Sequence, residues 1–230
     1  NETDGLAIPP TPVVGGVGLI EDVSKIATLK GAQPGDVLIL IGETKGHLGA
    51  SLYAREILGL KGEALGAPPP INLEIEQKNA DFVRILIEQG FVNAVHDVSD
   101  GGIACAAAEM ALASNLKLYA DLDNAAAATW SAGSSFSVTE FLFSEDSGRF
   151  LVSAEDAEPI YKKALDAGIP ASFIGFGSFF ELSEIDSGIE WGDDDIILEN
   201  DVDGSGAFIP LSRLRQAHED WLPTYMNSVD

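Results

Sequence analysis

One polar stretch organises the chain, and it reads His96-Asp97-Val98-Ser99-Asp100-Gly101-Gly102. The residues before it, 91–95, form a short apolar run that is typical of a buried strand. After it, small and apolar residues recur at helical spacing as far as Ser114. The sequence therefore predicts that a strand, a polar turn and a helix meet at this point.

The turn combines the features of an anion site with two carboxylates. Gly101 and Gly102 allow a ligand to approach the backbone closely, and the first N–H groups of a helix have no partner within it. Such a helix end favours phosphate, with Ser99 as a further ligand. Because Asp97 and Asp100 repel an anion, we expect Mg²⁺ to lie between them and the phosphate. The alternative is that Asp97, Ser99 or Asp100 caps the helix and the glycines only form the turn.

The composition limits the classes of function. The chain has 230 residues, of which 46% are hydrophobic, enough for one large or two small domains. Its formal net charge of −24 argues against binding to nucleic acid or to an anionic membrane. Without a long apolar run or a signal-peptide pattern, the protein is expected to be cytoplasmic. The single cysteine, Cys105, lies among alanines and is expected to pack rather than react.

A second glycine-rich segment, Gly42–Ser51, follows an apolar run that is typical of a core strand covered on both faces. Gly46, Gly49 and Ser51 are candidate phosphate ligands there. However, their spacing relative to the lysine is not that of a Walker A motif. The alternative is a glycine-rich connection that only ends the strand.

The same patterns predict the other elements. A strand interrupted by glycines is expected at 13–20, and a domain boundary is expected near Lys30. The last third of the chain is expected to form short strands and turns, among them an Asp-Gly hairpin turn at 203–204. Further strands are expected at 37–42, 116–122 and 150–152, helices at 52–58, 72–89, 141–143, 154–167 and 211–226, and a small-residue loop at 125–135. This order predicts an α/β (α+β) fold, a mixed β-sheet packed with helices.

Several motifs together resemble one enzyme family. They are Asn1–Gly15, His96–Met110, Phe143–Arg149 and the closing Arg213–Pro223. In this order they closely resemble the C-terminal part of the phosphoribosylformylglycinamidine synthases, the PurL family of purine biosynthesis. The likeness extends over essentially all 230 residues. A start at Asn1 rather than at methionine also suggests a piece of something longer.

The resemblance implies a fold similar to that of aminoimidazole ribonucleotide synthetase, called PurM-like. Residues 1–30 would be the tail of an ATP-binding A domain, and residues 31–230 a complete second B domain. The family converts formylglycinamide ribonucleotide, ATP and glutamine-derived ammonia into the amidine, ADP and phosphate. The implied cofactors are Mg²⁺ and ATP or ADP. The implied partners are the remaining PurL domains, a glutaminase subunit and a small PurS-type subunit.

The resemblance also points to individual residues. Asp97 matches a Mg²⁺-binding aspartate of the family's first B domain. Glu145-Asp146-Ser147 match a substrate-binding Glu-Ser-Gln stretch, and Asp146 and Ser147 depart from that pattern. Glu145, Ser147 and the nearby Arg149 are candidate phosphate or nucleotide ligands. The family's catalytic histidines and its nucleotide-binding Gly-Asn-Val-Ser stretch match nothing here. Two hypotheses follow: the chain is part of an ATP-dependent carbon–nitrogen ligase and inactive alone, or it is a non-catalytic half that organises the synthase complex.

Overall fold

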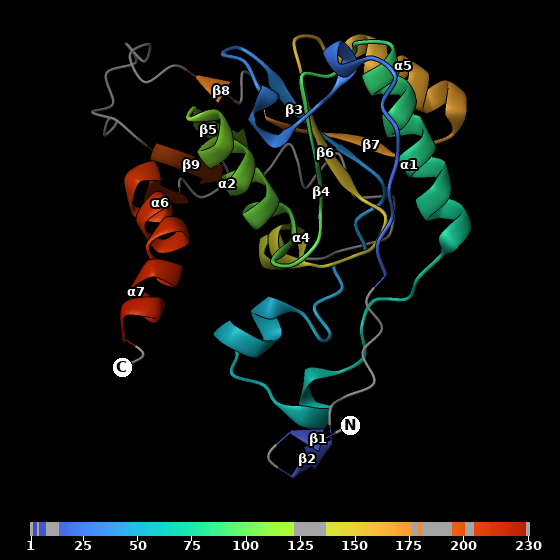
Figure 1. The fold of residues 1–230 in the computed structure, drawn as a ribbon. Coiled ribbons are helices and arrows are strands. Elements are labelled where there is room, and N and C mark those ends of the chain that lie inside the picture. Colours follow the sequence, from blue (N-terminus) through green and yellow to red (C-terminus); the bar gives the residue numbers. More distant parts are fainter. Residues whose placement is uncertain are drawn as a thin grey trace.

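A computed structural model describes residues 2–3, 5–7, 14–121, 137–175, 179–180, 195–200 and 205–228. Its central sheet has the strand order β4-β6-β3-β7 (Figure 1). The strands are β3 at Val37–Ile41, β4 at Ala94–Asp97, β6 at Phe150–Ala154 and β7 at Ala171–Gly175. All neighbours in this sheet are antiparallel. Strand β3 is therefore paired on both of its edges.

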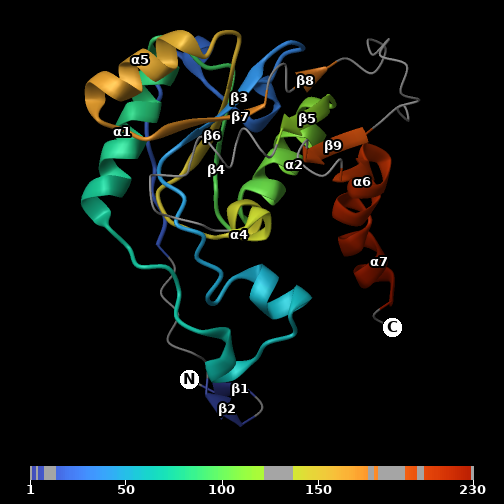
Figure 2. The same ribbon diagram turned by 180° about the vertical axis from the view of Figure 1, so that it is seen from behind.

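Both faces of the central sheet are covered by helices. Successive side chains of a strand point to opposite faces, so Leu38 and Leu40 join the core cluster under α2, at Gly102–Ser114. Ile39 and Ile41 join a second cluster with helices α1 (Leu73–Glu88) and α5 (Glu158–Ala167). Figures 1 and 2 show α2 on one side of the sheet and α1 with α5 on the other. The predicted core strand with two covered faces is confirmed.

A second sheet has the order β10-β9-β5-β8. Its strands are β5 at Lys117–Asp121, β8 at Phe179–Phe180, β9 at Asp195–Asn200 and β10 at Ser205–Pro210. Strands β5 and β9 are parallel and the other pairs are antiparallel. Helices α4 (Val138–Phe143) and α6 (Leu211–Glu219) pack against α2 and extend its core cluster. The predicted mixed α/β architecture is thus confirmed, with eight of the described strands divided between two four-stranded sheets.

Smaller elements complete the described part of the chain. They are the β1–β2 hairpin (Glu2–Thr3 and Leu6–Ala7), 3₁₀ helices at Val23–Lys25, Leu29–Gly31 and Gly62–Leu65, the π-helix η3 at Tyr53–Ile57, and helix α7 at Trp221–Ser228. In the described residues, none of the helices has the length and apolar character that crossing a membrane requires.

Two predicted elements take another form. Residues 14–20 form no strand, because they pair with no other strand in the described part of the chain. The predicted helix at 52–58 is the π-helix η3. In it the Leu58 N–H donates to the Tyr53 carbonyl, five residues back, at 3.1 Å.

Other boundaries shift. The strand predicted at 91–95 is β4, so His96 and Asp97 lie inside the strand. Helix α5 begins at Glu158, with a proline in its first turn, rather than at 154. The closing helix is divided at Asp220 into α6 and α7. The loop at 125–135 and the turn at 203–204 lie outside the described residues, although β9 and β10 pair as a hairpin requires.

Candidate functional site

Most of the predicted site residues line one open pocket of about 750 Å³. It lies between α1, the β4–α2 turn and the segment that follows α4, and its lining includes Ala50, Pro68, Pro69 and Ile71. The predicted residues in its wall are Asp97, Ser99, Asp100, Glu145, Ser147 and Arg149, and Glu76 adds another carboxylate. Gly46, Gly49, Ser51, Gly101 and Gly102 are not part of this wall.

None of the three side chains considered as caps, those of Asp97, Ser99 and Asp100, caps α2. Gly101 precedes the helix in the left-handed region, with φ of 80°. The Asp97 carboxylate instead accepts a hydrogen bond from the Ser99 hydroxyl at 2.7 Å, and the Gly102 N–H donates to the Ser99 carbonyl. The capping interpretation of Asp97, Ser99 and Asp100 is therefore wrong. A side chain distant in sequence supplies the hydrogen-bond acceptor at the start of this helix.

Glu145 supplies the missing acceptor. Its Oε1 accepts hydrogen bonds from the Gly101 N–H at the start of α2 and from the Leu52 N–H at the start of η3, each at 2.8 Å. A negative charge at the N-terminus of a helix is favourable because the helix dipole is positive there. Glu145 thus binds one of the N–H groups that a phosphate at this helix end would use.

Asp146 does the same for the second glycine-rich segment. This buried carboxylate accepts hydrogen bonds from the N–H groups of Lys45 at 2.8 Å and Gly46 at 3.0 Å. Together, Glu145 and Asp146 bind four main-chain N–H groups, three of them in the two segments predicted to bind phosphate and the fourth, that of Leu52, at the start of η3. We refer to this arrangement as the carboxylate clasp. It joins three distant parts of the chain.

Arg149 is a structural side chain behind the clasp. It is 1% exposed, and its guanidinium donates to the carbonyls of Asp146 at 3.0 Å and Ser144 at 2.7 Å and to the Thr44 hydroxyl at 3.0 Å. Burial lowers the pKa of Arg149 to about 10, so the group stays charged at neutral pH. Its donors are directed at the protein and not at a ligand in the pocket.

Gly49 and Ser51 also have structural roles. A Cβ on Gly49 would lie 2.3 Å from the Ala67 carbonyl oxygen, so only glycine fits there. The buried Ser51 hydroxyl donates to the Leu48 carbonyl at 2.7 Å and accepts from the Ala54 N–H at 3.1 Å. The interpretation of Gly42–Ser51 as a glycine-rich connection accounts for these contacts.

The pocket is strongly acidic. Four carboxylates line it, against the single buried Arg149. Asp97 is exposed, and the Ser99 hydroxyl, with a smaller contribution from His96, lowers its pKa, so it is ionised at neutral pH. Within the described ranges, no three His, Cys, Asp or Glu side chains gather closely enough to hold a metal ion. Mg²⁺ at Asp97 and Asp100 would need further ligands from elsewhere, and it stays a prediction.

Sequence reasoning missed the clasp because its partners are remote. Asp146 bonds to residues about 100 positions earlier, and nothing near it in sequence signals this contact. The motif likeness had marked Asp146 only as a departure from a substrate-binding pattern. A second missed contact is the 2.6 Å pair of His96 Nε2 and Glu109 Oε2, which ties β4 to α2. Cys105 is partly buried on α2, and burial raises the pKa of its thiol, as expected for a packing residue.

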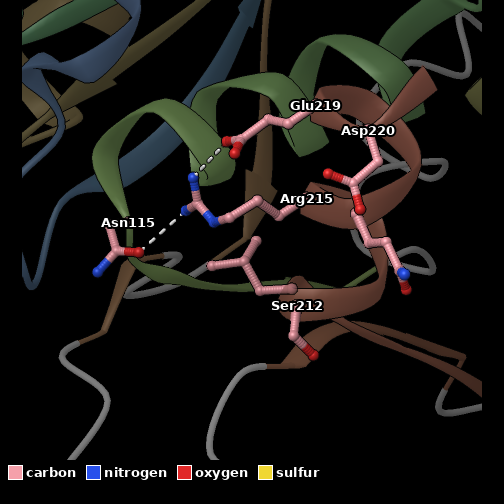
Figure 3. Close-up of a pocket in the computed structure, with 7 residues that line it drawn as sticks. Asn115, Ser212, Arg215, Glu219 and Asp220 are labelled. Carbon is pink, nitrogen blue, oxygen red and sulfur yellow. Dashed lines mark hydrogen bonds and ion pairs between the residues drawn. The ribbon is translucent and has the colours of Figure 1, made fainter. Parts of the chain in front are cut away.

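A second surface pocket, of about 470 Å³, lies beside α6 (Figure 3). Arg215 lies within it and donates to the Asn115 side chain at 3.0 Å and to Glu219 at 2.8 Å. It contains none of the predicted site residues.

Comparison with known proteins identifies the family. The model of the family described as AIR synthase related protein, C-terminal domain, matches residues 33–176, more than half of the chain. The chain belongs to this family. The matched region of this AIR synthase-related domain contains the 750 Å³ pocket and the clasp.

Relatives of the AIR synthase-related domain are much longer proteins. The subunit PurL of phosphoribosylformylglycinamidine synthase from Caulobacter vibrioides is 41% identical over 228 residues, which are 99% of this chain and 26% of the relative. The chain therefore spans about a quarter of the relative it matches.

Solved structures agree in fold. PurL of T. maritima in complex with FGAR has a TM-score of 0.65 and 18% identity, and the match covers 84% of this chain and 30% of that one. The same protein in complex with ATP has a TM-score of 0.57 and 17% identity, with 84% and 27% covered.

Proposed function

We propose that this chain is the C-terminal part of a cytoplasmic PurL-type phosphoribosylformylglycinamidine synthase. In the longer enzyme, formylglycinamide ribonucleotide and ammonia would be joined at the expense of ATP, in purine biosynthesis. The observation that carries the proposal is the 41% identity to a PurL subunit over 99% of the chain. The partners we propose are the remaining PurL domains, a glutaminase subunit and a PurS-type subunit.

Within that enzyme we propose a non-catalytic role for this domain. The supporting observation is the carboxylate clasp, because the N–H groups of Gly46 and Gly101 that would bind phosphate already bind carboxylates. ATP and Mg²⁺ would act in other domains. Neither the clasp nor Arg149 offers a donor to an incoming phosphate, so we derive no catalytic step through this chain's residues.

We also propose that residues 1–30 belong to a neighbouring domain and that residues 31–230 form the AIR synthase-related domain. Val14, Val17 and Leu19 are each more than 90% exposed. These three large apolar side chains lie within six residues, and they leave water only if another part of the protein covers them. The preceding part of a longer chain would supply it.

A chimeric enzyme tests the proposal. Its design replaces the matching C-terminal 26% of the Caulobacter PurL relative with this chain. We expect the purified chimera to convert formylglycinamide ribonucleotide with ATP and ammonium. The 230-residue chain alone, assayed in parallel, should show no turnover, because the implied catalytic groups lie outside it. A soluble chimera with a cooperative melting transition but no turnover would contradict the proposal, as would turnover by the chain alone.

A further inference from the structure

Helix α7 has an apolar face that the described part of the chain leaves uncovered. Trp221, Leu222, Tyr225 and Met226 are 65, 55, 53 and 64% exposed. Their spacing puts them on one side of the helix. Figures 1 and 2 show that α7 continues from α6 and leads away from both sheets. Because apolar surface gains free energy on leaving water, this face is suited to binding.

A shallow, open groove of about 390 Å³ runs along one side of α6 and α7, and Trp221 and Tyr225 belong both to it and to the apolar face. We call it the α6–α7 groove, and it is lined by Gln216, Ala217, Asp220, Trp221, Thr224 and Tyr225. The Trp221 and Tyr225 rings are stacked, with centroids 5.6 Å apart and planes 8° from parallel. Trp and Tyr are enriched among the residues that contribute most to binding at protein interfaces.

The groove contains one charge, the carboxylate of Asp220. The nearby Arg215 is directed away from it, toward Asn115 and Glu219 (Figure 3). No cationic side chain among the described residues forms an ion pair with Asp220. A carboxylate next to the indole of Trp221 suits a Lys or Arg side chain, which can pair with the carboxylate and lie against the ring.

We propose that the α6–α7 groove and the apolar face of α7 bind a basic amphipathic helix of a partner protein. Its apolar residues would cover Trp221, Leu222, Tyr225 and Met226, and a Lys or Arg would enter the groove beside Asp220. A helix that lays its apolar face into a groove is a common mode of recognition. The net charge of −24 favours a basic partner and disfavours a second copy of this chain, because two such copies repel each other.

A designed peptide serves as the probe. It is an 18-residue amphipathic helix of leucine and lysine with a fluorescent label, titrated with the 230-residue chain at 0.15 M salt and followed by anisotropy. The double variant Trp221→Ala/Tyr225→Ala should weaken binding at least tenfold, and Asp220→Asn about three- to tenfold. The control variants on α5, Leu165→Ala and Asp166→Asn, also alter exposed side chains, but on a helix far from the groove, and should change the dissociation constant less than twofold.

Three results would overturn the proposal. One is equal weakening by Asp166→Asn and Asp220→Asn, which would mean that only the overall charge attracts the peptide. Another is equally tight binding of a peptide with glutamate in place of lysine. The third is self-association of the wild type in sedimentation velocity that Trp221→Ala/Tyr225→Ala abolishes while peptide binding is unchanged, because the face would then bind a second copy. Circular dichroism confirms the fold of each variant before titration.

Discussion

Gly102→Ala is expected to destabilise the chain by about 3 kcal/mol or more, enough to remove much of the stability of a typical domain. A Cβ at this position would lie 2.5 Å from the Ser144 carbonyl oxygen and 2.6 Å from that of Leu142. These are backbone atoms at the end of α4 and cannot rotate away. In addition, φ of 70° is unfavourable for alanine. Urea unfolding followed by circular dichroism measures the change in free energy.

Gly90→Ala is the matched control for this substitution. Gly90 has nearly the same φ, 71°, but nothing lies within 4 Å of its would-be Cβ. Only the unfavourable left-handed backbone conformation of alanine then counts, so we expect the free energy of unfolding to fall by about 1 kcal/mol. Equal losses in the two variants would contradict the close packing of α2 on the end of α4.

The second large effect is expected for Arg149→Met, which should lower the free energy of unfolding by about 3 to 5 kcal/mol. The substitution leaves the carbonyls of Ser144 and Asp146 and the Thr44 hydroxyl without their buried donor. It also removes the positive charge next to Asp146. Arg149→Lys should fall between wild type and methionine, because one ammonium cannot reach all three acceptors.

Arg55→Met is the control for charge removal. Arg55 is exposed, and its ion pair in the described part of the chain is with its neighbour Glu56. The expected change is within about 0.5 kcal/mol. A loss from Arg149→Met that is no larger than this would contradict the structural role of the buried guanidinium.

Local patterns predicted most of the fold. The run at 37–42 indicated a strand with two covered faces, because every residue in it is apolar, and the helical spacing of 72–89 and 103–114 gave α1 and α2 to within a residue or two. The strand predicted at 13–20 did not form at the described residues 14–20, because a strand needs the edge of another strand to pair with. Sequence pattern alone does not show whether such an edge is present. The break at Asp220 also has no strong local signal, since Pro223 is tolerated in the first turn of the next helix.

The site was predictable in location but not in chemistry. The turn at 96–102 does face a pocket, and Glu145 does meet it. Local sequence could not show that Glu145 and Asp146 would satisfy the N–H groups of Gly101 and Gly46, because these contacts join residues 44 and 100 positions apart. Glycine-rich turns have free N–H groups only until the tertiary fold supplies an acceptor.

The most direct measurement of the central claim, that this domain is structural and not catalytic, uses the chimeric enzyme with Asp97→Asn. The substitution removes the carboxylate charge that a magnesium-bridged phosphate site requires, while asparagine can still accept the Ser99 hydroxyl hydrogen bond. We predict that the turnover of formylglycinamide ribonucleotide changes less than twofold. A loss of a hundredfold or more, with an unchanged melting temperature, would contradict the account and assign Asp97 to the metal site of the reaction.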